Sequence, residues 1–225
     1  MKYFTELQEG VYDPNIFKAF FLAGGPGSGK SYVARRTTGG TGLKTINSDD
    51  QFEHLLKKAG LSLKMPKSQE TPRNKLRDRA KDMTASKRGN YLDGRLGLII
   101  DGTARDPNKI LRQHVHLKEL GYDTHMIFVN TSVDVALERN AQRARSVPEE
   151  IVVRSWKEVQ GNMGKFSQIF QQNFIVVDNN DAGEDVFLKV FKQIKNRLRI
   201  KPTSGIAKNW IANETMEKVN RHLQR

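Results

Sequence analysis

The stretch that most constrains the fold is GGPGSGKS at residues 24–31, which matches the pattern G-x-x-x-x-G-K-[ST] at every defined position. The apolar run FKAFFLA at 17–23 precedes it, as expected of a buried strand that ends in a loop. The helical stretch KSYVARR follows it. This order of strand, glycine loop and helix is typical of a loop that binds phosphate with backbone amides and a helix N-terminus. The pattern therefore predicts an α/β protein with a site for a nucleoside triphosphate.

Each residue type in this loop has a defined task. Glycines let the backbone approach the phosphates closely, and a lysine and a hydroxyl complete the site. Lys30 is placed to reach the β- and γ-phosphates, and Ser31 offers its hydroxyl to Mg²⁺. The alternative is a glycine-rich turn that binds nothing, which the flanking strand and helix disfavour. The residues expected to bind ATP are Gly25, Gly27, Ser28, Gly29, Lys30 and Ser31.

Short apolar runs alternate with helical segments along the chain. The expected strands are residues 17–23, 43–46, 96–100, 125–130 and 174–180. In one intervening helix, Asp106 is the expected N-cap and Pro107 the first residue. This alternation predicts a parallel sheet of about five strands with helices on both faces, and ligand-binding loops at the carboxyl ends of the strands.

The length and composition limit the function classes. The chain has 225 residues, which suits one sizeable domain, and we expect that domain to span 1–200. There is no cysteine, which excludes disulfides and thiolate metal sites. No apolar run approaches the ~20 residues needed to cross a bilayer, so we expect a cytoplasmic protein that does not engage a membrane. Lys and Arg outnumber Asp and Glu 38 to 25, a formal charge of +13, which favours a polyanionic partner such as nucleic acid.

A basic segment interrupts the alternation at about residues 60–95. Residues 64–95 hold ten Lys or Arg against four acidic residues. We expect a mostly helical insertion that faces a substrate, because it lies between two loops that hold candidate catalytic or metal-binding aspartates. The alternative is a solvated helical surface. The cations expected to bind substrate are Arg77, Arg79, Lys87 and Arg88. A second basic segment, 201–225, forms a tail that we expect to dock through Trp210 and Ile211.

Carboxylates follow two of the expected strands. Asp49 and Asp50 come just after 43–46, where one of them can accept the proton of an attacking hydroxyl. The alternative is that Ser48 or either aspartate caps the next helix, and one aspartate capping while the other catalyses satisfies both readings. Asp101 follows 96–100 and stands where an acid that orders Mg²⁺ belongs. Thr103 and Arg105, on the same loop, are expected to donate hydrogen bonds to substrate; the alternative for both is turn chemistry.

An arginine cluster, in the segment LERNAQRARSVPEE, predicts a lid at about residues 139–150. Arg139 and Arg143 are four residues apart on one helical face, and Arg145 lies at the helix exit, before a Ser146-x-x-Glu149 capping box. Arginines on a mobile lid can close over the triphosphate and neutralise the charge of the transition state. The alternative is a solvated face on which the arginines pair with nearby glutamates.

Taken together, these motifs resemble the zeta-toxin and polynucleotide-kinase group of P-loop kinases. The matching segments are GGPGSGKS, INSDD, LGLIIDGTAR with DPNKILRQHVHLKELGYD, and ALERNAQRARSVPEEIV, in the order and spacing of that group, over residues 17–166. The resemblance implies a P-loop kinase-like fold and ATP-dependent phosphorylation of a hydroxyl. It also implies that Asp49 is the base, that Lys30 and Ser31 contact phosphate and magnesium, and that Arg139, Arg143 and Arg145 are lid arginines.

The resemblance leaves the acceptor open. INSDD and ERNAQR look like polynucleotide kinases, which phosphorylate a 5′-hydroxyl end, and the basic insertion favours this nucleic-acid or nucleotide acceptor. IIDGTAR looks like zeta toxins, which phosphorylate UDP-N-acetylglucosamine, and that reading would imply a neutralising antitoxin-like partner protein. A third hypothesis is a nucleic-acid-binding NTPase that transfers the γ-phosphate to water.

Overall fold

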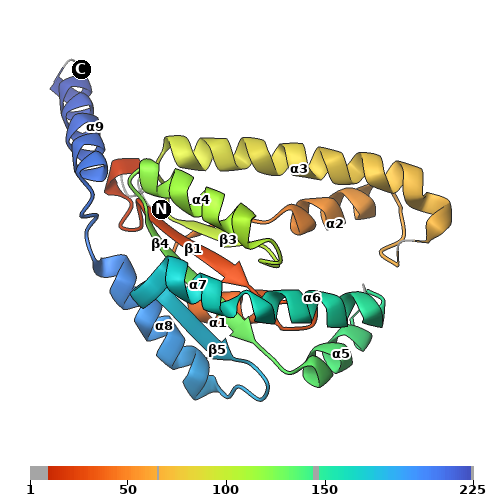
Figure 1. Cartoon of the computed structure of the whole chain (residues 1–225). Helices are drawn as coiled ribbons and strands as arrows, with labels where there is room; N and C mark the ends of the chain where they lie inside the picture. Colours follow the sequence, from red (N-terminus) through yellow and green to blue (C-terminus); the bar gives the residue numbers. More distant parts are fainter. Residues whose placement is uncertain (1–9, 65, 144–146, 224–225) are drawn as a thin grey trace.

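A five-stranded, all-parallel sheet forms the centre of the computed structural model, which describes residues 10–64, 66–143 and 147–223 (Figure 1). Its strand order is β2-β3-β1-β4-β5. The predicted α/β fold with a parallel sheet is therefore confirmed. Its strands are β1 (Lys18–Ala23), β2 (Lys44–Ile46), β3 (Leu98–Asp101), β4 (Asp123–Asn130) and β5 (Phe174–Asp178).

Helices connect these strands and cover both faces of the sheet (Figure 1). The α-helices are α1 (Lys30–Thr38), α2 (Ser48–Lys58), α3 (Glu70–Asp93), α4 (Pro107–Glu119), α5 (Val133–Ala141), α6 (Glu149–Gly161), α7 (Met163–Phe170), α8 (Glu184–Arg199) and α9 (Gly205–Leu223). Short 3-10 turns are η2 (Gly10–Tyr12), η3 (Lys67–Gln69) and η4 (Gln171–Asn173). Asp106 caps α4 as predicted, since its side chain accepts hydrogen bonds from the backbone N–H groups of Asn108 and Lys109.

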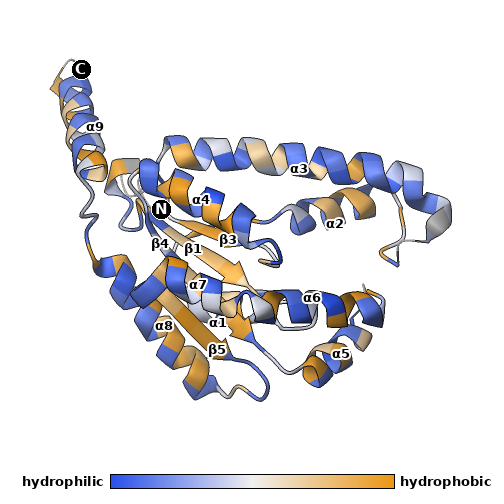
Figure 2. Ribbon diagram, viewed as in Figure 1, coloured by the Kyte–Doolittle hydropathy of each residue, from blue (hydrophilic) through white to orange (hydrophobic). Residues whose placement is uncertain are grey.

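Alternation along the strands divides the core into two layers. In β1, Ala19, Phe21 and Ala23 pack on α4 and α7, whereas Phe20 and Leu22 pack on α1 and α8. The strands are apolar on both faces for this reason, and Figure 2 shows them as apolar ribbons between helices that mix polar and apolar residues.

The predicted basic insertion forms α3, which lies alongside α2 and extends beyond the sheet (Figure 1). The two helices share a small core of their own, in which Phe52 and Leu56 of α2 meet Ala80 and Leu76 of α3. This third cluster positions α2, whose N-terminus lies at the carboxyl edge of the sheet.

The C-terminal tail forms α9, whose first turns pack on the main core. The Trp210 ring meets the Phe17 ring edge-on, with centroids 5.4 Å apart, and Ile211 packs on the same cluster. Both residues were the expected docking points. Within the described part of the chain, no helix is both long and apolar enough to cross a membrane.

Candidate active site

A cleft of about 430 Å³ lies at the carboxyl edge of the sheet, where the segments after β1, β2 and β3 meet the end of α5 and the residues that follow it. It brings together most of the predicted site residues, although their catalytic roles stay predictions. The lining residues are Gly25, Pro26, Gly27, Gly29, Lys30, Ser31, Tyr32, Asn47, Asp49, Asp50, Glu53, Asp101, Gly102, Thr103, Arg139, Arg143 and Val147.

The loop between β1 and α1 has the conformation of a phosphate cradle. Gly29 has a φ of 80°, in the left-handed region, and a Cβ there would lie 2.5 Å from Asn179 Nδ2. The Ser28 carbonyl accepts a hydrogen bond of 2.8 Å from that same amide, which ties the loop to the end of β5. Among the described residues, the buried Ser28 hydroxyl has no hydrogen-bond partner, so it is available to donate to a bound anion.

Lys30 enters the cleft from the first position of α1. Burial lowers the pKa of its ammonium, and the charge of Arg143 lowers it further, while Asp101 and Asp49 oppose the shift. A buried cation beside a second cation needs an anionic ligand to offset the loss of hydration. The electrostatics therefore fit a phosphate group at Lys30.

Asp49 and Asp50 lie in the first turn of α2, at the cleft. The alternative that Ser48 or either aspartate caps this helix is wrong, because the N-cap is Asn47, whose Oδ1 accepts a 2.8 Å hydrogen bond from Asp49 N. Sequence alone could not choose among four adjacent residues that all cap helices well. The capping task thus falls to an amide, and neither carboxylate is used for it.

Asp101 ends β3 beside Leu22 of β1, and its carboxylate reaches the same cleft. Burial raises its pKa, as do the charges of Asp50 and Asp49, while Lys30 lowers it. The pKa of Asp50 is also raised, by burial first and by Asp49 and Glu53 next. This concentration of negative charge around Asp101 suits a bound cation.

The donor set fits Mg²⁺ in part. Mg²⁺ prefers oxygen ligands and is usually held by one or two protein groups together with substrate phosphates and water. Ser31 and Asp101 both line the cleft, where they supply a hydroxyl and a carboxylate. No group of three or more His, Cys, Asp or Glu residues in the described ranges could hold a metal by itself. The site therefore fits a metal that arrives with a nucleotide.

Two of the three predicted lid arginines lie at the cleft. The Arg139 guanidinium donates to the carbonyls of Asn179 and Asn180, at 2.7 and 3.0 Å, rather than pairing with a glutamate. Arg143 is exposed and close enough to Lys30 to lower its pKa. Arg145 lies outside the described residues.

Within the predicted lid segment, Asn140 at the end of α5 holds Val147. The Asn140 amide donates to the Val147 carbonyl at 2.8 Å and accepts from Val147 N at 3.1 Å. The helix α6 begins at Glu149 with Pro148 as its N-cap, and Ser146, the predicted first residue of a capping box, lies outside the described residues. Proline at this position offers no side-chain cap.

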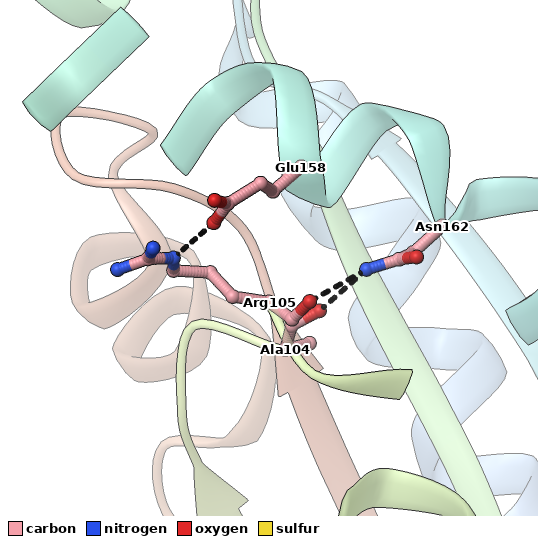
Figure 3. Close-up of polar contacts among 4 residues, drawn as sticks. All are labelled: Ala104, Arg105, Glu158 and Asn162. Carbon is pink, nitrogen blue, oxygen red and sulfur yellow. Dashed lines mark hydrogen bonds and ion pairs between the residues drawn. The ribbon is translucent and has the colours of Figure 1, made fainter. Parts of the chain in front are cut away.

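Thr103 lines the cleft, but the Arg105 side chain turns away to α6 (Figure 3). Its Nε donates to the Glu158 carboxylate, and Asn162 Nδ2 donates to the carbonyls of Arg105 and Ala104, at 2.9 and 3.4 Å. Ala104 has a φ of 57°, a left-handed conformation that these bonds help to hold. Arg105 lines a neighbouring cleft of about 500 Å³, which shares residues 101–103 with the first.

The four predicted cations of α3 occupy different environments. The Arg77 guanidinium lies over the Phe52 ring, 4.6 Å from its centroid, and Arg79 is exposed. Lys87 is half-buried and close enough to Asp50 for its charge to lower the pKa of that carboxyl. Arg88 is half-buried, and burial lowers its pKa. The charge of Lys87 therefore reaches the acidic side of the cleft.

Sequence reasoning missed several residues that shape the site. They are asparagines and a glutamate, whose partners are remote in sequence except for that of Asn140, seven residues away: Asn47, Asn140, Glu158, Asn162 and Asn179. Asn47 carried a detectable signal, because it directly precedes the acidic turn and caps well. The others had none, since their partners are known only once the chain has folded.

Comparison with known proteins places this cleft in a family. A family model described as "AAA domain" (AAA_33) matches residues 20–165, a span that holds the phosphate loop, both acidic segments and the lid. The chain belongs to this AAA domain family. No curated protein matches it in sequence.

Solved structures share the fold of this AAA domain. A chain of "AvrRxo1-ORF1:-ORF2 with ATP" is 13% identical with a TM-score of 0.55, over 84% of this chain and 65% of that one. A chain of the PezAT chromosomal toxin-antitoxin system of Streptococcus pneumoniae is 17% identical with a TM-score of 0.51, over 92% and 87%. A chain of the Pnkp1/Rnl/Hen1 RNA repair complex is 24% identical with a TM-score of 0.50, over 68% of this chain and 47% of that one. Likeness at these identities establishes a P-loop kinase-like α/β fold and no particular activity.

Proposed function

We propose that the protein is an ATP-dependent kinase that transfers the γ-phosphate of ATP to a hydroxyl group on a nucleic acid or nucleotide. The observation that carries this proposal is the meeting of two loops at one cleft. Lys30 and Ser31 come from the phosphate loop after β1, and Asp49 and Asp50 come from the turn after β2. A phosphate cradle opposite a carboxylate is what transfer to an alcohol requires.

In this reaction Asp49 accepts the proton of the acceptor hydroxyl as its oxygen attacks the γ-phosphorus. The new P–O bond forms while the bond from the γ-phosphorus to the bridging oxygen of ADP breaks, and ADP leaves with that electron pair. Lys30 and Arg143, whose charges lie close to each other, stabilise the negative charge on the transferred group. Asp49 rather than Asp50 is proposed as the base because Asp49 is the one that matches the base of the zeta-toxin and polynucleotide-kinase group.

Mg²⁺ is the implied metal, and Ser31 and Asp101 would hold it. When bound, it supplies positive charge that offsets the charge of the phosphates. The neutralising charge also explains why a cleft can concentrate Asp49, Asp50, Glu53 and Asp101 around a phosphate site.

A polyanionic acceptor is supported by the charge of the chain and by Lys87. The formal charge of +13 and the half-buried Lys87 beside Asp50 would let a backbone phosphate lie next to the reacting hydroxyl. The likeness to a chain of an RNA repair complex agrees with this acceptor. The phosphate of a nucleotide would use the same cation.

The second candidate is a zeta-toxin-like kinase that phosphorylates a UDP-sugar such as UDP-N-acetylglucosamine. The likeness to a chain of a toxin-antitoxin system favours it, and an antitoxin-like partner protein would then be expected. A sugar acceptor would extend along the loop of Thr103 and Arg105, but Glu158 already engages the Arg105 guanidinium. We therefore rank this candidate second.

The test is a labelling panel. The protein is incubated with γ-labelled ATP and Mg²⁺ together with 5′-hydroxyl DNA, 5′-hydroxyl RNA, nucleosides and UDP-sugars, and the labelled product is identified. Asp49→Asn should lose most transfer while keeping its ATP affinity, because a base acts in the transition state. Asp134→Asn, an exposed first-turn acid of α5 away from the cleft, is the matched control and should behave as wild type.

Free phosphate released at the same rate with and without every acceptor would instead support an NTPase. Glu53 lines the cleft and is the residue that could then position a water molecule, although its carboxylate pairs with Lys57 at 2.7 Å. In that case Glu53→Gln would abolish the release.

A further inference from the structure

Asn47 lies between β2 and α2 and joins two parts of the cleft that are far apart in sequence. Its Oδ1 accepts a hydrogen bond from Asp49 N at 2.8 Å, which caps α2. Its Nδ2 donates to Asp101 Oδ2 at 2.9 Å and lies 3.4 Å from Asp50 Oδ1. One side chain thus holds the N-terminus of α2 against the end of β3.

Capping alone does not require an amide at this position. Serine and aspartate cap helices about as well as asparagine. Serine has one hydroxyl oxygen, so a serine that caps α2 has no second polar atom to reach Asp101 as the amide nitrogen does. Aspartate would cap α2 but would add a carboxylate next to Asp50 and Asp101. The amide both accepts from the backbone and donates to the carboxylates.

The bond to Asp101 has a consequence for the proposed chemistry. It engages one carboxylate oxygen, Oδ2, and leaves Oδ1 of Asp101 for the metal or its water. It also sets the position of Asp49, since the residue that caps the first turn of α2 is the one bonded to β3. Residues that orient a ligand in this way commonly change metal affinity by about 10–100-fold when they are replaced.

We propose that Asn47 is a positioning residue that holds the base-bearing turn of α2 and the metal-side acid of β3 in one arrangement. This inference rests on the proposed kinase function. Its role is to fix where Asp49 and Asp101 stand relative to the phosphate loop, and Asn47 itself contacts no reacting atom.

The experiment compares Asn47→Ser with Asn47→Ala. The serine variant keeps a capping oxygen and loses the amide nitrogen that bonds Asp101, whereas the alanine variant loses both. Asp106→Ser, which exchanges one capping residue for another at α4 away from the phosphate loop, is the control for cap replacement. Each protein is measured for melting temperature, for the Mg²⁺ concentration that gives half-maximal stabilisation by ATP, and for kcat and KM of transfer.

For Asn47→Ser we expect a melting temperature as close to wild type as that of the Asp106→Ser control. We also expect a roughly 10-fold or greater rise in the Mg²⁺ requirement for ATP binding, and a loss of kcat that exceeds any change in the KM for ATP. Asn47→Ala should show the same losses with a lower melting temperature. Wild-type Mg²⁺ requirement and kcat in Asn47→Ser would overturn the proposal and leave Asn47 as a cap. A melting temperature of Asn47→Ser far below the control, with an unchanged Mg²⁺ requirement, would also overturn it.

The Mg²⁺ requirement for ATP binding is measured without an acceptor. Its result therefore does not depend on whether the protein phosphorylates a hydroxyl. If wild-type protein phosphorylates no hydroxyl but Asn47→Ser still raises the Mg²⁺ requirement, the kinase proposal fails and the positioning of Asp101 stands. If transfer occurs and the variant matches wild type in every measurement, the kinase proposal stands and the role of Asn47 fails.

Discussion

Replacing Lys87 and Arg88 on α3 with serine should flatten the salt dependence with which the protein binds single-stranded nucleic acid. The same change at Lys75 and Arg79 should have little effect. Lys87 and Arg88 are half-buried, and the charge of Lys87 reaches Asp50 in the cleft. Lys75 and Arg79 are exposed on α3, eight or more residues before Lys87.

The magnitude follows from counterion release. Each phosphate neutralised on a single strand contributes a slope of about −0.7 to log affinity against log salt. Three or four contacts to α3 and the phosphate cleft would give a wild-type slope of about −2 to −3. Loss of two contacts should make the slope shallower by about 1.4. Arg77 is left in place, because its guanidinium packs over Phe52 and its removal would disturb the contact between α2 and α3.

The assay is fluorescence anisotropy of a labelled 5′-hydroxyl oligonucleotide across a series of KCl concentrations, with ATP affinity and melting temperature measured on each protein. Retained ATP affinity in both double variants would show that the phosphate loop is undisturbed. Equal flattening by the two pairs would mean that α3 attracts nucleic acid only as a diffuse charge. A wild-type slope near zero would refute the polyanionic acceptor altogether.

Three further outcomes follow from the structure. Lys30→Ala should slow transfer by roughly 10³-fold or more, because the ammonium stabilises negative charge in the transition state. Its melting temperature should not fall, because burying an ammonium, whose pKa is lowered by that burial, costs folding energy. Wild-type transfer would refute the phosphate-loop assignment. Arg139→Lys should weaken ATP binding and slow transfer roughly 10-fold or more, since one ammonium cannot replace two guanidinium bonds to the carbonyls after β5; a normal kcat/KM for ATP would show that those bonds are dispensable. Burial lowers the pKa of His125 to about 3, so the unfolded chain binds a proton that the folded chain does not, and stability is lost as pH falls below about 6.5, by up to about 1.4 kcal/mol per pH unit. Denaturant titrations should show that His125→Phe removes this acid sensitivity and that His116→Gln, at an exposed position, does not; an unchanged pH dependence in His125→Phe would contradict the assignment.

Much of the fold was predictable because its signals are local. The apolar runs identify strands buried on both faces, and the glycines, Lys30 and Ser31 follow the first strand within a few residues. Asp101 and the Asp49–Asp50 pair reach the same cleft because parallel strands end at one edge of a sheet. No long-range contact has to be known for these inferences.

The sequence by itself therefore determined the sheet, the phosphate loop and the edge at which the chemistry lies. Only the tertiary structure decided which group each polar side chain bonds. In the folded chain Asn47 caps α2, and the Arg139 guanidinium donates to carbonyls 40 and 41 residues away. The Arg105 side chain pairs with Glu158. The physical reason is that capping and hydrogen-bonding groups have many equivalent local partners in an unfolded chain. Folding removes water from most of them, and the packing of remote elements then selects the partner that satisfies each group.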